Sequence, residues 1–262
     1  MVDFEMRDSY DLQDLERIVT ILRAPGGCPW DREQTHESLR RGTLEECYEV
    51  IEAINEHSPD HMKEELGDLL LQVVFHADIE REAGRFDLHD VADGICKKLI
   101  FRHPHVFGDV SVENSAEVLV NWDNLKQQEK HQSTYTDTLN AVARSLPALW
   151  RAEKVQKKAK KAGFDWDDAQ GAVDKLSEEL GELKEAMAQG TNVEEELGDL
   201  LFAAVNVSRF VKCDPETALN AATEKFISRF AKVEALARDQ GKDMAQMSLE
   251  ELDKLWEQAK RT

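Results

Sequence analysis

The sequence has few of the residues that would indicate disulfides, a metal-binding cysteine motif or a membrane anchor. Its four cysteines, Cys28, Cys47, Cys96 and Cys213, include no CxxC pair, so neither a disulfide framework nor a zinc site is expected. No apolar run approaches the ~20 residues of a membrane-spanning helix, and the first ten residues lack the basic and apolar regions of a signal peptide. We therefore expect a cytoplasmic protein with no membrane segment.

Positive charge and turn-forming residues are also scarce. The 262 residues include 33 Lys plus Arg against 53 Asp plus Glu, a net charge of −20. Because nucleic-acid binding depends on clustered Lys and Arg, direct nucleic-acid binding is not expected. The 13 Gly and 6 Pro are too few for a turn-rich β-sandwich or a disordered chain. The motifs GxGxxG and GxxxxGK[ST] are absent, so nucleotide binding through a Rossmann fold or a P-loop is not expected.

What the sequence does contain is a long internal repeat. The segment EELGDLL at 64–70 recurs at 195–201, and GCPWD at 27–31 is echoed by GFDWD at 163–167. The order of these motifs is kept while their separation changes by a few residues, as expected when insertions and deletions fall in loops. The chain is therefore predicted to be a tandem duplication. The predicted domains are 1–130 and 139–262, with a polar linker at 127–138.

Within each repeat, apolar residues recur at intervals of three and four, which is typical of amphipathic helices. The predicted helices cover 39–55, 60–83, 91–102, 176–187, 193 onward and 215–238, and one further helix in each repeat carries Trp122 or Trp256. Strand signals are almost absent. We predict an all-α protein in which each repeat is a helical bundle. Because each bundle has few helices with broad apolar faces, we expect a homodimer to complete the cores.

Carboxylates gather on one face of neighbouring helices in each repeat. In the second repeat Glu179 and Glu182 are three residues apart, as are Glu196 and Asp199, so each pair shares a helix face. A short connection makes the two helices antiparallel neighbours, which brings all four carboxylates together. We call these residues the second quartet. The first quartet consists of Glu46, Glu49, Glu65 and Asp68.

Four carboxylates in a small volume repel one another, so raised pKa values, basic partners or a cation must compensate. Oxygen ligands are those that Mg²⁺ or Mn²⁺ prefers. A single ExxE pair is more often a solvated helix face. Two such pairs joined by a hairpin, in each of two repeats, favour a metal site. By spacing, Glu179 and Glu182 are equally good candidates for the residue that orients or deprotonates a water.

Basic residues occupy matching places in the two repeats. Lys98 and Arg102 are four residues apart, as are Lys225 and Arg229, so each pair lies on one helix face. Such pairs are usually surface charges, but in a chain this acidic they suggest a clamp for a metal-bound polyphosphate. The tryptophans of the last predicted helices leave two roles open, core packing and stacking on a base.

Together, the paired carboxylates, the GCPWD and GFDWD segments and the LGDLL helices resemble the MazG family of nucleoside triphosphate pyrophosphohydrolases, over about residues 15–260. The resemblance implies all-α halves, homodimers, and Mg²⁺-dependent hydrolysis of NTPs and dNTPs, ATP among them, to nucleoside monophosphate and pyrophosphate. It implies that the second half is the usual seat of activity and that the quartets are metal ligands. Residues expected around the nucleotide are Lys175, Glu195, Asp199, Lys225, Arg229 and Trp256.

Two other functions stay open at this point. An acidic helical protein could use the same faces to bind regulatory partners instead of a substrate. A narrower hydrolase acting on deoxyuridine or deoxycytidine nucleotides could also be built on a related bundle. The sequence does not fix the base preference, because that depends on the geometry of the base pocket.

Overall fold

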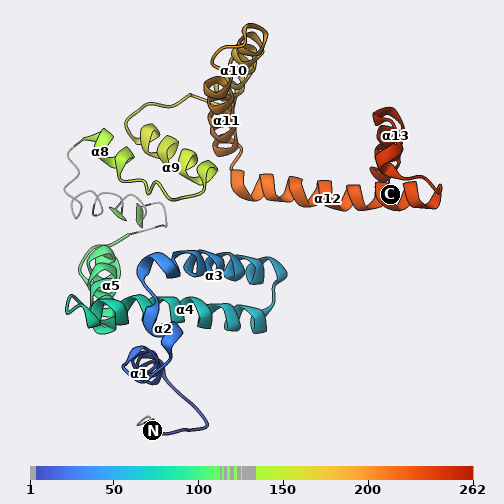
Figure 1. Ribbon diagram of the computed structural model, residues 1–262. Helices are drawn as coiled ribbons and strands as arrows, with labels where there is room; N and C mark the ends of the chain where they lie inside the picture. Colours follow the sequence, from blue (N-terminus) through green and yellow to red (C-terminus); the bar gives the residue numbers. More distant parts are fainter. Residues whose placement is uncertain are drawn as a thin grey trace. The chain divides into compact units, whose positions relative to one another are not determined.

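The computed structural model describes residues 4–112, 114, 117–118, 121–122, 125 and 134–261. Every regular element in this part of the chain is helical, which confirms the predicted all-α class (Figure 1). The helices are α1 Leu12–Arg23, α2 Pro29–Glu33, α3 His36–Glu56, α4 Pro59–Glu82, α5 Leu88–Arg102, α6 Pro104–Phe107, α8 Tyr135–Asn140, α9 Ala148–Lys161, α10 Ala169–Gln189, α11 Val193–Phe210, α12 Pro215–Asp239 and α13 Leu249–Ala259, with a short 3₁₀ helix at Met244–Gln246.

The chain divides into two compact units, Met1–Lys126 and Gln127–Thr262. Most of the predicted linker, 127–133, lies outside the described residues. At the end of that segment, Thr134 and Asp137 form a capping box that starts α8. Each of these two residues accepts a hydrogen bond from the other's backbone amide, so polar residues without a core can still begin a helix.

In the first unit, α3 and α4 form an antiparallel hairpin, and α1 packs across α4 (Figure 1). The turn between them follows from local chemistry, since His57 is left-handed, Ser58 caps α4 and Pro59 occupies its first turn. The small core joins Val19 of α1 to Val74 and Phe75 of α4, with Leu39 of α3.

Buried ion pairs reinforce the α1–α4 contact. The Arg23 side chain is 4% exposed, and its Nε lies 3.3 Å from Asp78 Oδ2 and its Nη2 2.8 Å from Glu82 Oε2. The Thr20 hydroxyl donates to Asp78 Oδ1 at 2.7 Å. Since a buried charge is tolerated only when it is paired, these contacts fix α1 in one register on α4.

The second unit repeats the arrangement. Helices α10 and α11 form a hairpin, α9 packs on α11, and α12 packs against α9, α11 and α13. Gly190 ends α10 with a left-handed backbone, φ 69°. Asn192 precedes α11 with a left-handed backbone, φ 55°, and its side chain makes no capping hydrogen bond to the helix amides.

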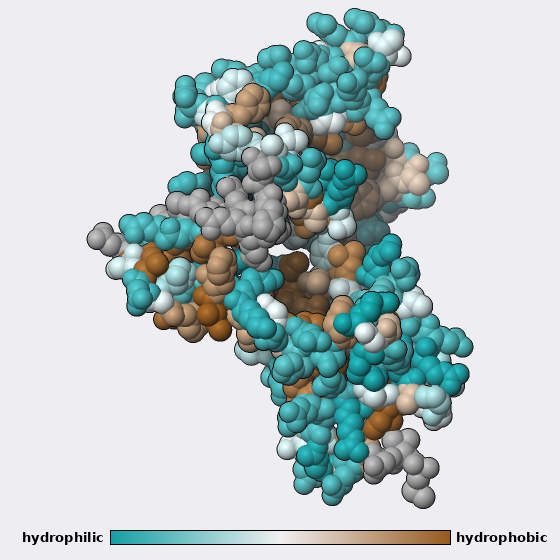
Figure 2. Space-filling view, turned by 90° about the vertical axis from the view of Figure 1, so that its left-hand side faces the viewer, coloured by the Kyte–Doolittle hydropathy of each residue, from teal (hydrophilic) through white to brown (hydrophobic). Residues whose placement is uncertain are grey.

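Large apolar side chains remain exposed on the helices that carry the carboxylates and the basic residues. Brown hydrophobic side chains are visible at several places on the face in Figure 2. In the second unit they include Leu180, Leu197, Leu201 and Phe202 on α10 and α11, and Leu219, Phe226, Ile227 and Phe230 on α12. At Gly67 and Gly198, the glycines of the LGDLL segments, a Cβ would meet no atom within 4 Å from the described residues outside the adjoining helix backbone. Within the described part of the chain, no neighbouring element therefore approaches these glycines closely.

None of the described helices combines the length and the apolar character that a bilayer-crossing segment requires.

Candidate functional site

The second quartet comes together largely as its spacing predicts. Glu179 and Glu182 of α10 face Glu196 of α11, and one carboxylate oxygen from each lies within 4.8 Å of the others. Glu179 is only 6% exposed. Asp199, the fourth expected ligand, is one helical turn beyond Glu196 on α11 and is not part of this close group. Three acidic oxygens in this arrangement suit a hard divalent cation such as Mg²⁺.

The first unit builds the same group from α3 and α4. Glu46, Glu49 and Glu65 each place an oxygen within 4.8 Å of the other two. Asp68 is outside that group but near enough for its charge to raise the pKa of Glu46. The same spacing of acidic residues thus gives the same cluster in both repeats.

The clustering has an electrostatic cost that appears in the carboxyl pKa values. Burial raises the pKa of Glu182, and the neighbouring Glu179 carboxylate raises it further. In the first unit, burial and then the charge of Asp68 raise the pKa of Glu46, while burial and then the charge of Glu49 raise that of Glu65. Carboxyl groups in such a cluster bind a proton or a cation more readily than isolated, solvated carboxylates do.

Each cluster also has a basic neighbour, and the two neighbours differ. In the second unit Lys175 Nζ lies 2.8 Å from Glu179 Oε1 and 2.8 Å from Glu178 Oε1, and these contacts raise the pKa of Lys175. In the first unit His61 Nε2 lies 3.1 Å from Glu65 Oε1, and Glu56 raises the pKa of His61. Sequence reasoning missed His61, although its spacing of four residues from Glu65 on one helix was a usable signal.

The basic pair and Trp256 are not brought to the second quartet within one chain. Lys225 and Arg229 lie on α12, whose main contacts are with α9, α11 and α13 rather than with α10. A hydrogen bond from Lys260 lowers the pKa of Glu257 on α13, and the charge of Arg229 is close enough to lower it a little further. The Trp256 ring lies 5.1 Å from the Phe226 ring and joins the core that α12 and α13 share. Within a single chain, Trp256 therefore packs as a core residue.

The remaining predicted positions are simpler to place. Glu195 is exposed in the first turn of α11, next to Glu196. Lys98 and Arg102 lie on α5, which packs against α4, the helix of Glu65 and Asp68.

Comparison with known proteins identifies the family of the chain. The model of the MazG nucleotide pyrophosphohydrolase domain matches residues 34–107 and 168–234, which contain both quartets. The chain belongs to the MazG family.

Relatives cover nearly the whole length of this MazG-family chain. It is 49% identical, over 95% of both chains, to the nucleoside triphosphate pyrophosphohydrolase/pyrophosphatase MazG of Thermotoga maritima. It is 45% identical, over 95% of this chain and 98% of the other, to the nucleoside triphosphate pyrophosphohydrolase of Escherichia coli K12. A third relative, the protein YabN of Bacillus subtilis, is 47% identical over 97% of this chain and 52% of YabN.

Proposed function

We propose that the protein hydrolyses nucleoside triphosphates, both NTPs and dNTPs, to nucleoside monophosphate and pyrophosphate, with Mg²⁺ held by the second quartet. The observation that carries this proposal is the close group of Glu179, Glu182 and Glu196 across the α10–α11 hairpin. The names of two near-full-length relatives support the same reaction. A role in cleansing the nucleotide pool or in stress-linked control of nucleotides, in the cytoplasm, follows as part of the proposal.

A divalent cation at this site would neutralise phosphate oxygens and acidify a water molecule. The residues that would hold it are Glu179, Glu182, Glu196 and, one turn further along, Asp199. Among the two candidates for the base, Glu182 is the better one. Glu179 is already engaged by Lys175, whereas the raised pKa of Glu182 brings its carboxylate nearer to the range in which a general base works well.

Basic residues are needed for the outer phosphates, because a leaving pyrophosphate carries several negative charges. Lys175 is already beside Glu179 and can transfer its contact from the carboxylate to a phosphate. Lys225 and Arg229 lie on α12, away from α10 in the packing of one chain. We assign these two residues to the site in a homodimer, in which the α12 of a second copy meets the acidic face.

Two features support that dimer. The helices that carry the second quartet and the basic pair both leave large apolar side chains exposed, and such faces are usually covered by a partner. The acidic face and the basic pair are also complementary in charge, which favours their association in one orientation.

The test is a product assay on a panel of NTPs and dNTPs with Mg²⁺, measuring pyrophosphate against orthophosphate. Pyrophosphate is the expected product, and Glu179→Gln should abolish its release. The matched variant Glu46→Gln changes the same position of the first quartet and should retain most of the activity. If the protein were an acidic interaction module instead, neither product would form. The same panel decides between a broad hydrolase and one restricted to deoxypyrimidine nucleotides.

A further inference from the structure

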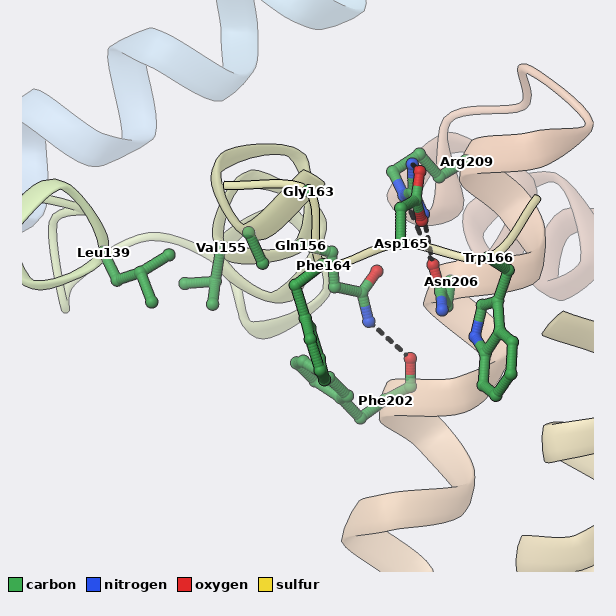
Figure 3. A pocket seen from close by; sticks show the side chains of 11 residues that line it. Leu139, Val155, Gln156, Gly163, Phe164, Asp165, Trp166, Phe202, Asn206 and Arg209 are labelled. Atoms are coloured by element: carbon green, nitrogen blue, oxygen red, sulfur yellow. Dashed lines mark hydrogen bonds and ion pairs between the residues drawn. The ribbon is translucent and has the colours of Figure 1, made fainter. Parts of the chain in front are cut away.

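A cavity of about 440 Å³ lies in the second unit, away from the carboxylates. It is lined by α8, α9, α11 and the loop 163–166 that leads into α10 (Figure 3). Its size falls within the roughly 300–1,000 Å³ that is usual for small-molecule sites. Three aromatic side chains line it, Phe164, Trp166 and Phe202. The cavity is partly open to solvent, because all three of these aromatic residues are exposed, so a ligand can reach it from outside.

The cavity also contains an unpaired acceptor. The Gln156 side chain is 7% exposed, and its Nε2 donates to the backbone oxygen of Phe202 at 2.8 Å. No donor in the described part of the chain reaches its buried Oε1. Figure 3 shows this oxygen turned away from the Phe202 carbonyl, on the side where Asp165 and Asn206 lie. A buried acceptor without a donor is costly, so a ligand that donates a hydrogen bond here would be favoured.

The other polar groups of the cavity are neutral or neutralised. Arg209 forms an ion pair with Asp165, through Nη1 to Oδ2 at 3.0 Å and through a shorter second contact. Arg209 also donates to Asn206 Oδ1, from Nη2 at 2.7 Å and from Nε at 3.2 Å. The amide nitrogen of Asn206 is then the donor that this side chain offers to the cavity. The site thus presents flat apolar walls, one acceptor and one donor, without net charge.

The first repeat fills the corresponding place with side chains. The alignment of the two EELGDLL segments puts Phe75 of α4 where α11 has Asn206, and Asp78 where α11 has Arg209. Phe75 is 5% exposed and packs in the core with Val19 of α1 and Val74. The second repeat therefore has a polar amide at a position where the same fold can hold a buried phenyl ring.

We propose that this cavity binds a nucleobase. A base is planar, so it can stack on the aromatic walls, and it carries hydrogen-bond donors and acceptors side by side on one edge. An amino or imino group of the base would donate to Gln156 Oε1, and a ring nitrogen or carbonyl would accept from the Asn206 amide. Asn206 is seven residues beyond Asp199 on α11, a rise of about 10 Å. Both the base of the nucleotide being hydrolysed and that of a second nucleotide are sources with this chemistry.

The test uses the full chain with adenosine, guanosine, cytidine and uridine in the absence of Mg²⁺, and measures binding by saturation-transfer NMR. Since these probes have no phosphate and are not hydrolysed, the result does not depend on the proposed catalytic function. At least one nucleoside should bind, and Asn206→Phe, which installs the residue of the first repeat, should abolish binding. Gln156→Leu should weaken it about tenfold by removing the acceptor. The control Val211→Phe adds the same ring to an exposed position and should leave binding unchanged.

The proposal is overturned if no nucleoside binds at about 10 mM, or if folded Asn206→Phe binds as well as the natural chain. If Asn206→Phe does not fold, Phe164→Ala replaces it, because that ring is 82% exposed and its loss should weaken stacking by about tenfold without unfolding the protein. A further arm identifies the source of the base. Displacement of the nucleoside by a non-hydrolysable triphosphate with Mg²⁺ indicates the base of the substrate, and simultaneous binding indicates a second nucleotide.

Discussion

Lys175 Nζ lies 2.8 Å from Glu179 Oε1, one turn earlier on the same face of α10. The first repeat has Gly42 at the position that matches Lys175, and there His61 of the opposite helix contacts Glu65 instead. The two carboxylate clusters therefore have the same acids but different counter-charges. A lysine stays protonated at neutral pH, whereas a histidine gains or loses its proton near neutral pH. Two clusters with the same acidic residues can therefore differ in their chemistry.

The first prediction concerns this lysine. In Lys175→Met, binding of Mg²⁺ without nucleotide should become about threefold tighter, because the ammonium no longer competes for Glu179. The KM for nucleoside triphosphate should rise, since a phosphate contact is lost. Calorimetric titration and steady-state kinetics measure the two effects, with Lys184→Met on an exposed part of α10 as the control. Weaker Mg²⁺ binding would instead make Lys175 a residue that orders Glu179.

The second prediction concerns the repulsion among the acids. Because the folded-state pKa of Glu182 is raised, the native state holds this proton more tightly than the unfolded chain does. Stability is therefore lost as pH rises from 4.5 through the raised pKa. Without metal at pH 7, Glu182→Gln should raise the Tm by about 1–2 °C, and this gain should vanish below pH 4.5.

Mg²⁺ should reverse the order of the Tm values of the natural chain and Glu182→Gln. Millimolar Mg²⁺ should raise the Tm of the natural chain, since it binds the native state alone, and should raise that of Glu182→Gln much less. Thermal melts with and without Mg²⁺ give both comparisons. A natural chain whose Tm does not respond to Mg²⁺ would mean that the metal site is wrongly placed.

Much of the helical architecture could be predicted because local signals agree with it. The expected helix 39–55 is observed as α3 His36–Glu56, and the expected 60–83 as α4 Pro59–Glu82. Ser58, Pro59 and Gly84 mark the ends of α4 by their capping and backbone preferences, which are visible in the sequence. The carboxylate clusters were predictable for a similar reason, since spacing within a helix and a short hairpin leave little freedom.

The positions of α12 and α13 could not be predicted in this way. Spacing of four residues puts Lys225 and Arg229 on one face of α12, but it does not say which helix that face meets. In one chain the neighbour is α13, where Arg229 lies near Glu257 and Trp256 packs on Phe226. The cavity beside Gln156 could not be predicted either, because its walls come from four elements that are separate in the sequence.

The third prediction tests the dimer. Sedimentation equilibrium at micromolar concentration should give twice the chain mass of 29.8 kDa. Ile227→Glu places a charge on the exposed apolar face of α12 and should yield monomer with the helical content retained. The control Leu249→Glu changes an equally apolar but more exposed residue, at the start of α13, and should stay dimeric. A natural chain that sediments only as a monomer would contradict the assignment of α12 to a partner's site.

The fourth prediction concerns the phosphate clamp. Arg229→Ala should lose at least about 100-fold in kcat/KM, because a cation that stabilises the leaving pyrophosphate is removed. Its Tm and dimer mass should stay close to those of the natural chain. The control Arg238→Ala, on the same helix and near its end, should keep full activity. An Arg229→Ala protein that does not fold would show a structural role in place of the clamp.

We propose that the second quartet directs water to the α-phosphorus of a nucleoside triphosphate while basic residues hold the outer phosphates. Hydrolysis with Mg²⁺ in ¹⁸O-labelled water, followed by mass spectrometry of both products, shows which phosphorus is attacked. The label should enter the nucleoside monophosphate, and pyrophosphate should stay unlabelled. Label in the pyrophosphate would place the attack at the β-phosphorus and contradict the roles given to the quartet and to Arg229.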